Sequence, residues 1–501
     1  MTPSAEPDPR RWRILGVSLV VGFMSLLDVT IVNVAIPSIR SGLGTTSAQV
    51  QWVVSGYALA FGLTLVTGGR LGDAYGRRRL MVIGLLGFIA SSAAVGLAPS
   101  IGWVVVARLA QGAAAGFLTP QNAGLVQDLF SGAERGRAFG LFGLTVSVSS
   151  ALGPVIGGLI LAVAGQEDGW RWIFLVNVPI GLVALVYVAR VVPGRRDDVP
   201  DEVRIDLVGA LLLGLGVLLL LFPLVSVEGG ARSPLLLLLA APVCLYLFVR
   251  WEARTVRRGG APLLDVHLLR EVPGYASGLA VGAIYFTGFT GVFLVLSIHL
   301  QDALELTPLE AGAMLTPFAI GSAVSAPVAG RLVSHLHRRL TVVALVLMMS
   351  GVLGVVVLAA GREGVWLWWT LPPCLLLAGL GGGAVVSPNF TLTLSDVPPR
   401  MGGAAGGAIQ TGQRIGSSLG AALLVTVYQV GVSHTSTGWA LRAALLVALA
   451  VLAVALAVAV ADLRLRVRGS RRARTPRRRG AGQPPRRPGG TPPGSARRRH
   501  R

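Results

Sequence analysis

The sequence predicts an all-α integral membrane protein with 14 transmembrane helices. Of its 501 residues, 53% are hydrophobic and only 13% are charged, whereas about a quarter of the residues in a soluble domain are charged. The apolar residues gather in fourteen runs of about 20 residues, the length that an α-helix needs to cross a bilayer. Composition and run length together exclude a soluble domain.

The fourteen predicted spans follow one another with short loops. The first six lie near 14–36, 50–71, 80–98, 103–125, 138–163 and 171–191. The other eight lie near 206–225, 234–250, 275–297, 311–333, 340–360, 366–388, 403–431 and 439–461. The first run is about 23 residues long and lacks a small-residue cleavage site after it, so we expect a retained span and not a signal peptide.

Arginines on alternate loops predict the topology. They occur at Arg10, Arg11, Arg13, Arg77–Arg79, Arg135, Arg137, Arg195, Arg196, Arg254, Arg257, Arg258, Arg338, Arg339 and Arg400. The other loops carry acids, such as Glu167 and Asp302. Basic loops stay in the cytoplasm, so we expect both termini to be cytoplasmic. Lysine is absent, which is consistent with a GC-rich bacterial genome and with a place in a bacterial cytoplasmic membrane.

The net charge of +21 comes mainly from the C-terminal tail. Residues 464–501 contain 15 arginines and no acid, which leaves about +6 for the rest of the chain. This placement predicts loop anchors and a disordered Arg-rich tail over 462–501, either lying on anionic lipid or unbound. It gives no reason to expect a nucleic-acid partner. Cys244 and Cys374 both lie in apolar runs and predict neither a disulfide framework nor a metal site.

An internal repeat divides the chain. The segment "GRLGDAYGRRR" (69–79) returns as "GRLVSHLHRRL" (330–340), 261 residues later and again at the end of a span. We therefore predict two six-helix bundles related by pseudo-symmetry with a helix pair inserted between them, as in transporters that place their site between two repeats. The predicted parts are a cytoplasmic N-terminus (1–13), a first bundle (14–192), the inserted pair (206–250), a second bundle (275–461) and the tail (462–501).

The first copy of the repeat is a candidate gate at the cytoplasmic end. Its residues are Gly69, Asp73, Gly76, Arg77 and Arg78. The glycines permit close approach and a tight turn, Asp73 can pair with a cation or cap a helix, and the arginines reach the headgroups. A latch between the bundles explains all of these residues, whereas an arginine cluster that only sets topology leaves Asp73 and Gly76 unexplained. The second copy has Ser334 and His337 in their places, so we expect the latch in the first copy.

A glycine-rich stretch marks the fifth span. "SALGPVIGG" contains Gly153, Pro154, Gly157 and Gly158. Glycines four residues apart let helices pack closely, and a proline inside a helix frees a carbonyl and bends it. Ordinary small-residue packing is the alternative interpretation.

One acid and one arginine lie inside the membrane at similar depth. Asp28 is about 12 Å and Arg108 about 8 Å from the outer ends of their spans at 1.5 Å per residue. Each lowers the cost of burying the other. Burial disfavours the charged form of a carboxyl group, which allows proton exchange near neutral pH. We predict Asp28 as the proton or cation site, with Arg108 and Gln111 as its polar surroundings; a structural cluster that does not titrate is the alternative.

Three further polar residues are candidates for a cavity. Thr30 and Asn33 lie nearly opposite Asp28 on the first helix, so this helix is expected to meet protein or water on both sides. Arg414 lies in the thirteenth span, where lining the transport path and helix packing both remain open.

Taken in order, the motifs resemble the major facilitator superfamily. "GGRLGDAYGRRRLM" resembles its loop signature. "LDVTIVNVAIP", "RLAQGAAAG", "SALGPVIGG", "WRWIFLVNVPIG", "LTPLEAGAMLTPFAIG" and "SDVPPRMGGAAGGAIQTGQRIGSSLGAALL" are similar to its 14-span drug/proton antiporter branch. The resemblance covers residues 14 to about 460. It implies the major facilitator fold in a 6+2+6 arrangement, and it identifies "GPVIGG" as a feature of exporters.

The resemblance implies proton-driven efflux of small organic compounds, such as drugs or antibiotics, by alternating access. No nucleotide-binding or catalytic motif occurs in the sequence, so we expect a secondary transporter that uses a proton gradient, with no enzyme activity, cofactor or metal. Proton-coupled uptake of a small nutrient and export of a lipid or metabolite are the alternatives. A single acid in the membrane suggests a lipophilic or cationic cargo. We expect a monomer surrounded by membrane lipids.

Overall fold

A computed structural model describes residues 8–165, 167–194, 206–228, 233–260, 262–265, 267–359 and 364–474. Helix is the regular structure of these ranges, and fourteen segments in them are long and apolar enough to cross a membrane. The predicted all-α fold and its fourteen spans are therefore confirmed.

The first part of the chain supplies the first bundle and the inserted helices. The bundle consists of α1 (Arg11–Gly42), α2 (Ser47–Tyr75), α3 (Arg77–Gly96), α4 (Ile101–Leu129), α5 (Gly132–Ala164), α6 (Gly169–Leu175) and α7 (Asn177–Val191). The inserted elements are α8 (Leu207–Glu228), the 3₁₀ helix η1 (Ser233–Leu239) and α9 (Ala241–Arg257).

The rest of the chain supplies the second bundle. Its helices are α10 (Leu268–Glu271), α11 (Tyr275–Ile298), α12 (Pro308–Leu336), α13 (Arg338–Gly354), α14 (Val365–Thr393), α15 (Gly402–His434) and α16 (Thr437–Arg474). Two π-helical turns, η2 (His299–Ala303) and η3 (Val355–Ala359), extend α11 and α13, and the 3₁₀ turn η4 (Pro399–Met401) precedes α15.

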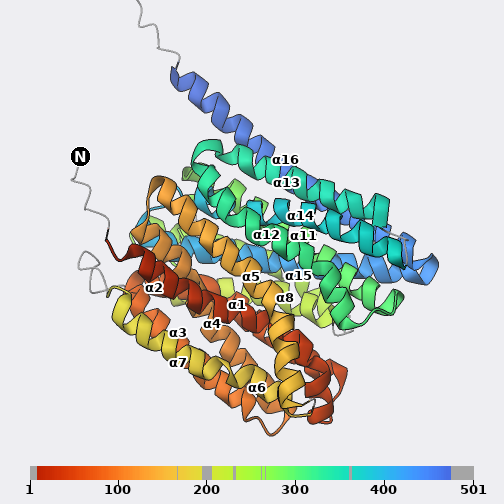
Figure 1. The fold of residues 1–501 in the computed structure, drawn as a ribbon. Coiled ribbons are helices and arrows are strands. Elements are labelled where there is room, and N and C mark those ends of the chain that lie inside the picture. The colour runs from red at the N-terminus through yellow and green to blue at the C-terminus, as the bar shows by residue number, and fades with distance from the viewer. Residues whose placement is uncertain are drawn as a thin grey trace, which may run out of the picture.

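The two bundles lie side by side (Figure 1) and meet through α2, α4 and α5 of the first and α12, α14 and α15 of the second. Within the first bundle α2 packs on α4 and α1 on α5, while within the second α11 packs on α15 and α12 on α14. Between the bundles α2 contacts α15, and α5 contacts α12. Helix α8 packs on both α2 and α15, so the inserted pair covers one side of the junction between the bundles.

Residues of the two bundles that lie 261 positions apart share the same local structure. Thr46 caps α2 in a capping box with Gln49, and Thr307 caps α12 in the same way with Glu310. At the other ends of these helices, Gly76 has φ 94° and His337 has φ 48°. A histidine in this left-handed region is uncommon, and it takes the backbone turn that Gly76 makes in the first copy.

The end of the molecule where α1 begins, here called the arginine-rich end, is closed by an apolar cluster. This cluster joins residues of both bundles, and the rings of Phe139 on α5 and Phe390 on α14 stack with centroids 5.6 Å apart. The bundles are therefore packed together at this end.

The predicted start of the tail at 462 is wrong by about three and a half turns. Helix α16 continues to Arg474, because arginine and leucine are good helix formers and Asp462 is held by Arg338, with 2.6 Å between Oδ2 and Nε. Residues 475–501 lie outside the described part of the chain.

Candidate functional site

Asp28 lies at the centre of a fully buried polar cluster in the first bundle. Its Oδ2 accepts a hydrogen bond from Arg108 Nη1 at 2.5 Å. Its Oδ1 accepts from Gln111 Nε2 at 3.1 Å and from Asn177 Nδ2 at 3.0 Å. Asp28, Arg108 and Gln111 are each 0% exposed. Two helices, α4 and α7, therefore supply the donors to one carboxylate on α1.

The predicted partners of Asp28 are thus brought together, and one partner was missed. Asn177 begins α7, at the point where α6 ends, so its amide enters the bundle at an interruption between two helices. An asparagine within the apolar run of the sixth span was the available signal. Hydropathy and helix period do not show which helix the amide faces.

Arg108 connects this cluster to a cavity. Its Nε donates to the carbonyl of Val53 at 2.9 Å, and its guanidinium carbon lies 4.1 Å from the ring centre of Tyr57. Arg108 and Tyr57 both line a cavity of about 30 Å³ between the bundles, whereas Asp28 does not. A change in the pairing of Arg108 would therefore alter the charge presented to this cavity.

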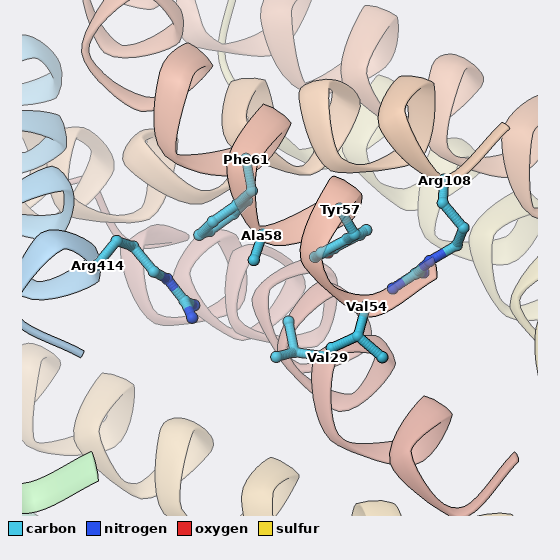
Figure 2. A pocket seen from close by; sticks show the side chains of 7 residues that line it. All are labelled: Val29, Val54, Tyr57, Ala58, Phe61, Arg108 and Arg414. Atoms are coloured by element: carbon cyan, nitrogen blue, oxygen red, sulfur yellow. The ribbon is translucent and has the colours of Figure 1, made fainter. Parts of the chain in front are cut away.

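The cavity is formed by helices of both bundles. Val29 comes from α1, Tyr57 and Phe61 from α2, Arg108 from α4 and Arg414 from α15. Figure 2 shows the guanidinium groups of Arg108 and Arg414 approaching from opposite sides, with the two aromatic rings between them. A cavity of about 30 Å³ has room for a water molecule or two, so a drug-sized cargo requires the bundles to separate here.

The other predicted cavity residues divide between two surfaces. Arg414 lines the cavity. Asn33 is exposed and lies one turn from Val29, on the same face of α1. Thr30 faces α5 instead, where its Oγ1 donates to the carbonyl of Ser149 at 3.2 Å. Thr30 is therefore a packing contact in this structure and not a cavity residue.

Thr30 meets the glycine motif of α5. A Cβ atom at Gly153 would lie 2.1 Å from Thr30 Oγ1, and one at Gly157 would lie 3.0 Å from the side chain of Ile31. Gly158 has no atom within 4 Å of such a Cβ. The motif therefore brings α1 and α5 into close contact through two of its glycines. Helix α5 runs through Pro154, whose side chain lies outside the described residues.

The gate motif joins the two bundles at the arginine-rich end. Asp73, near the end of α2, accepts hydrogen bonds from the backbone amides of Gly403 at 3.0 Å and Ala404 at 2.8 Å. These amides belong to the first turn of α15, where they lack partners within the helix and favour an anion. Gly69 permits the approach, because a Cβ atom there would lie 2.2 Å from the carbonyl oxygen of Gly403.

Arg77 holds Asp73 in place. Its Nη2 lies 2.8 Å from Asp73 Oδ1, and its Nε lies 2.6 Å from Asp128 Oδ2 at the end of α4. The expectation that Arg77 reaches the headgroups is wrong, since the side chain is buried between these two carboxylates. Arg78 is exposed and lies outside this contact. Gly76 provides the turn between α2 and α3 with φ 94°.

Two further contacts across the bundles lie at the same end. Gln127 Nε2 donates to the carbonyl of Leu394 at 2.5 Å, and Arg135 Nη1 donates to the carbonyl of Ser395 at 3.2 Å. Deeper in the molecule, the hydroxyls of Ser147 on α5 and Ser322 on α12 are 2.7 Å apart. The polar contacts thus close the arginine-rich end around backbone groups of the second bundle.

Two helical bundles, a charge pair buried within the spans and a latch at one end define the class of a membrane transporter with two-fold repeats. The chain belongs to the Major Facilitator Superfamily, whose sequence profile matches residues 18–421. It is a transporter and not an enzyme.

Comparison with known proteins gives relatives over most of the chain. It is 37% identical to the probable actinorhodin transporter of Streptomyces coelicolor over 430 residues, 85% of this chain and 74% of that protein. It is 36% identical to the puromycin resistance protein pur8 of Streptomyces alboniger, covering 84% of this chain and 82% of that protein. The crystal structure of the human organic anion transporter MFSD10 shares its fold, with a TM-score of 0.68 and 16% identity over 90% of this chain and 100% of that one.

Proposed function

We propose that this protein exports small, lipophilic organic compounds of the antibiotic or drug type in exchange for protons. The names of its two bacterial relatives, an actinorhodin transporter and a puromycin resistance protein, support export. The observation that carries the proton-coupled mechanism is the carboxylate of Asp28, which is buried in the first bundle and paired with Arg108.

In the proposed cycle a proton and Arg108 compete for Asp28. Protonation of Asp28 Oδ2 removes the acceptor that Arg108 Nη1 uses at 2.5 Å. The freed guanidinium then turns its charge toward the cavity, which it already lines. Loss of the proton restores the pair, so proton binding and the charge of the cavity are linked through one side chain.

The latch supplies the conformational part of the cycle. Asp73 holds the first turn of α15 through two backbone amides, and release of these bonds allows the arginine-rich end to open. We place this end, with both termini, on the cytoplasmic side of a bacterial cytoplasmic membrane, because basic loops stay in the cytoplasm. Transport by a monomer is proposed, since both bundles and the cavity belong to one chain.

Everted membrane vesicles test the exchange. Respiration acidifies their interior, and a fluorescent weak base reports the pH gradient. We expect addition of transported compounds from a panel of lipophilic antibiotics, puromycin included, to dissipate part of this gradient. Accumulation of a compound in the vesicles without any proton movement would rule out antiport, and accumulation accompanied by protons moving in the same direction would favour symport.

The variant Asp28→Asn tests the site in the same vesicles. We expect it to abolish the proton movement that accompanies transport, per amount of folded protein, because the amide does not titrate. It also leaves Arg108 without a counter-charge, which costs about 3–5 kcal/mol for a buried pair, so protein levels are measured in parallel. Asp302→Asn removes an exposed acid and serves as the control that retains exchange.

A further inference from the structure

Arg414 is a half-buried cation that takes no part in the proposed proton cycle. It lies in the middle of α15 and lines the cavity between the bundles. Among the described residues, no hydrogen bond or ion pair reaches its guanidinium. The ring centre of Phe61 lies 4.6 Å from Arg414 Cζ.

The nearby carboxylate is not available to Arg414. Asp28 already accepts from Arg108, Gln111 and Asn177, and it does not line the cavity. The cavity is therefore bordered by two guanidinium groups, of which only Arg108 has an acidic partner among the described residues. A cation inside the membrane that lacks a counter-charge is costly, so this surface favours a ligand that brings negative charge.

The aromatic rings beside Arg414 indicate the chemistry of the rest of that ligand. Tyr57 and Phe61, one turn apart on α2, have ring centres 6.0 Å apart and planes only 10° apart. Arg108 lies over the first ring and Arg414 over the second. Both rings are buried in this conformation. When the bundles separate, two parallel rings next to a cation suit a flat, aromatic molecule that carries an acidic group.

Gln410 adds a further polar group on the same side of α15. It lies one turn before Arg414 and one turn after Gly407, which packs against Leu65 of α2. The side chain is 6% exposed, and its Nε2 meets no acceptor among the described residues. A donor that is buried without a partner strengthens the preference of this helix face for an acceptor.

We propose that the exported cargo is a planar aromatic acid whose ionised carboxylate or phenolate pairs with Arg414 while its rings pack on Tyr57 and Phe61. This inference rests on the proposed export function and specifies its substrate class. It departs from the cationic cargo that the single membrane acid suggests, because Asp28 is occupied by Arg108 and does not line the cavity. Cargo and proton then bind at different residues, so exchange requires the anionic cargo to leave the cavity before protonation of Asp28 turns the charge of Arg108 toward it.

Binding of three matched probes to the purified full-length protein tests the inference. The probes are 1-pyrenecarboxylate, 1-pyrenemethanol and 1-pyrenemethylammonium, which share one ring system and differ in charge. Energy transfer from the protein's tryptophans to pyrene reports binding at pH 7.5. We expect the carboxylate to bind at least about tenfold more tightly than the other two, the effect of one hydrogen bond to a charged group.

Variants test whether Arg414 causes the preference for the carboxylate probe. We expect Arg414→Gln to lower the affinity for the carboxylate to that for the alcohol, and Arg414→Lys to retain part of the difference. Arg331→Gln removes an exposed arginine and should leave all three affinities unchanged.

The inference is overturned if the wild-type protein prefers the ammonium or alcohol probe, if none of the three binds, or if Arg414→Gln binds the carboxylate as tightly as the wild type does. Failure of the proposed function looks different. In that case the carboxylate preference and its dependence on Arg414 persist in the binding assay, while vesicles show no proton movement during transport.

Discussion

The two halves of the molecule differ in the acidic partners of their arginines. In the first half Arg77 and Arg108 each contact a carboxylate, at 2.6–2.8 Å and 2.5 Å. In the second half Arg338 contacts Asp462 at 2.6 Å, whereas no acid among the described residues pairs with Arg414. The first half therefore contains a complete charge pair suited to a proton, and the second contributes an open cation to the shared cavity. The two halves of the pseudo-repeat have equivalent helices but pair their charged side chains differently.

Arg77 and Arg338, which occupy equivalent positions, show the same asymmetry at the arginine-rich end. Arg77 holds Asp73, which reaches across to α15 of the other bundle. Arg338 contacts Asp462 and Asn389 within its own bundle. One copy of the motif thus links the bundles, and the other stabilises a single bundle. Three predictions test this comparison, from the largest expected effect to the smallest.

Replacing each arginine by glutamine separates the two roles. Both Arg77→Gln and Arg338→Gln remove a cation that contacts a buried carboxylate, so we expect each to lose about 3 kcal/mol or more of stability, seen as a lower melting temperature in detergent. Only Arg77→Gln should also lengthen the distance between spin labels on exposed Arg78 and Arg400, measured by double electron–electron resonance. An equal change of that distance in Arg338→Gln would show that both copies act as latches.

Gly69→Ala tests the latch without changing charge. A Cβ atom 2.2 Å from the carbonyl oxygen of Gly403 forces α2 and α15 apart. Overpacking of this kind costs about 1–3 kcal/mol, so we expect the population with an open arginine-rich end to rise about tenfold, reported by the same spin labels. Gly16→Ala, where a Cβ would meet nothing within 4 Å, is the matched control. Indistinguishable distance distributions for the two variants would contradict the latch.

The smallest expected effect is the difference in stability between variants of two glycines in the α5 motif. Gly153→Ala places a methyl group against Thr30 and should lower stability by about 1–2 kcal/mol. Gly158→Ala meets open space and should change stability by less than about 0.5 kcal/mol. Melting temperatures in detergent compare the two. Equal losses would mean that the motif does not act through contact between α1 and α5.

Much of this fold could be predicted from sequence because a membrane restricts what apolar runs can do. Each run of about 20 residues became a span, and the depth of Asp28 and Arg108 along their helices placed them at the same level, where they pair. Depth follows from the fixed rise of a helix. The arginine-rich repeat likewise marked the position of the latch before any contact was known.

Lateral contacts could not be predicted in the same way. The partner of Asp73 is the backbone of α15, 330 residues away, and backbone amides leave no signature in sequence. Arg77 is adjacent to two exposed arginines but turns inward to Asp128, and Thr30 turns to α5 and not to the cavity. Helix period gives the face of a residue, and only packing shows which helix lies opposite.

The double variant Asp28→Asn with Arg108→Gln tests the central claim most directly, because it removes the proton site and the buried counter-charge together. Its melting temperature should recover most of what Asp28→Asn loses, since no uncompensated charge remains in the cluster. The account predicts that everted vesicles with this variant still show no proton movement during transport. Proton-coupled efflux at the wild-type level in the double variant would contradict the account and leave Asp28 and Arg108 a structural pair.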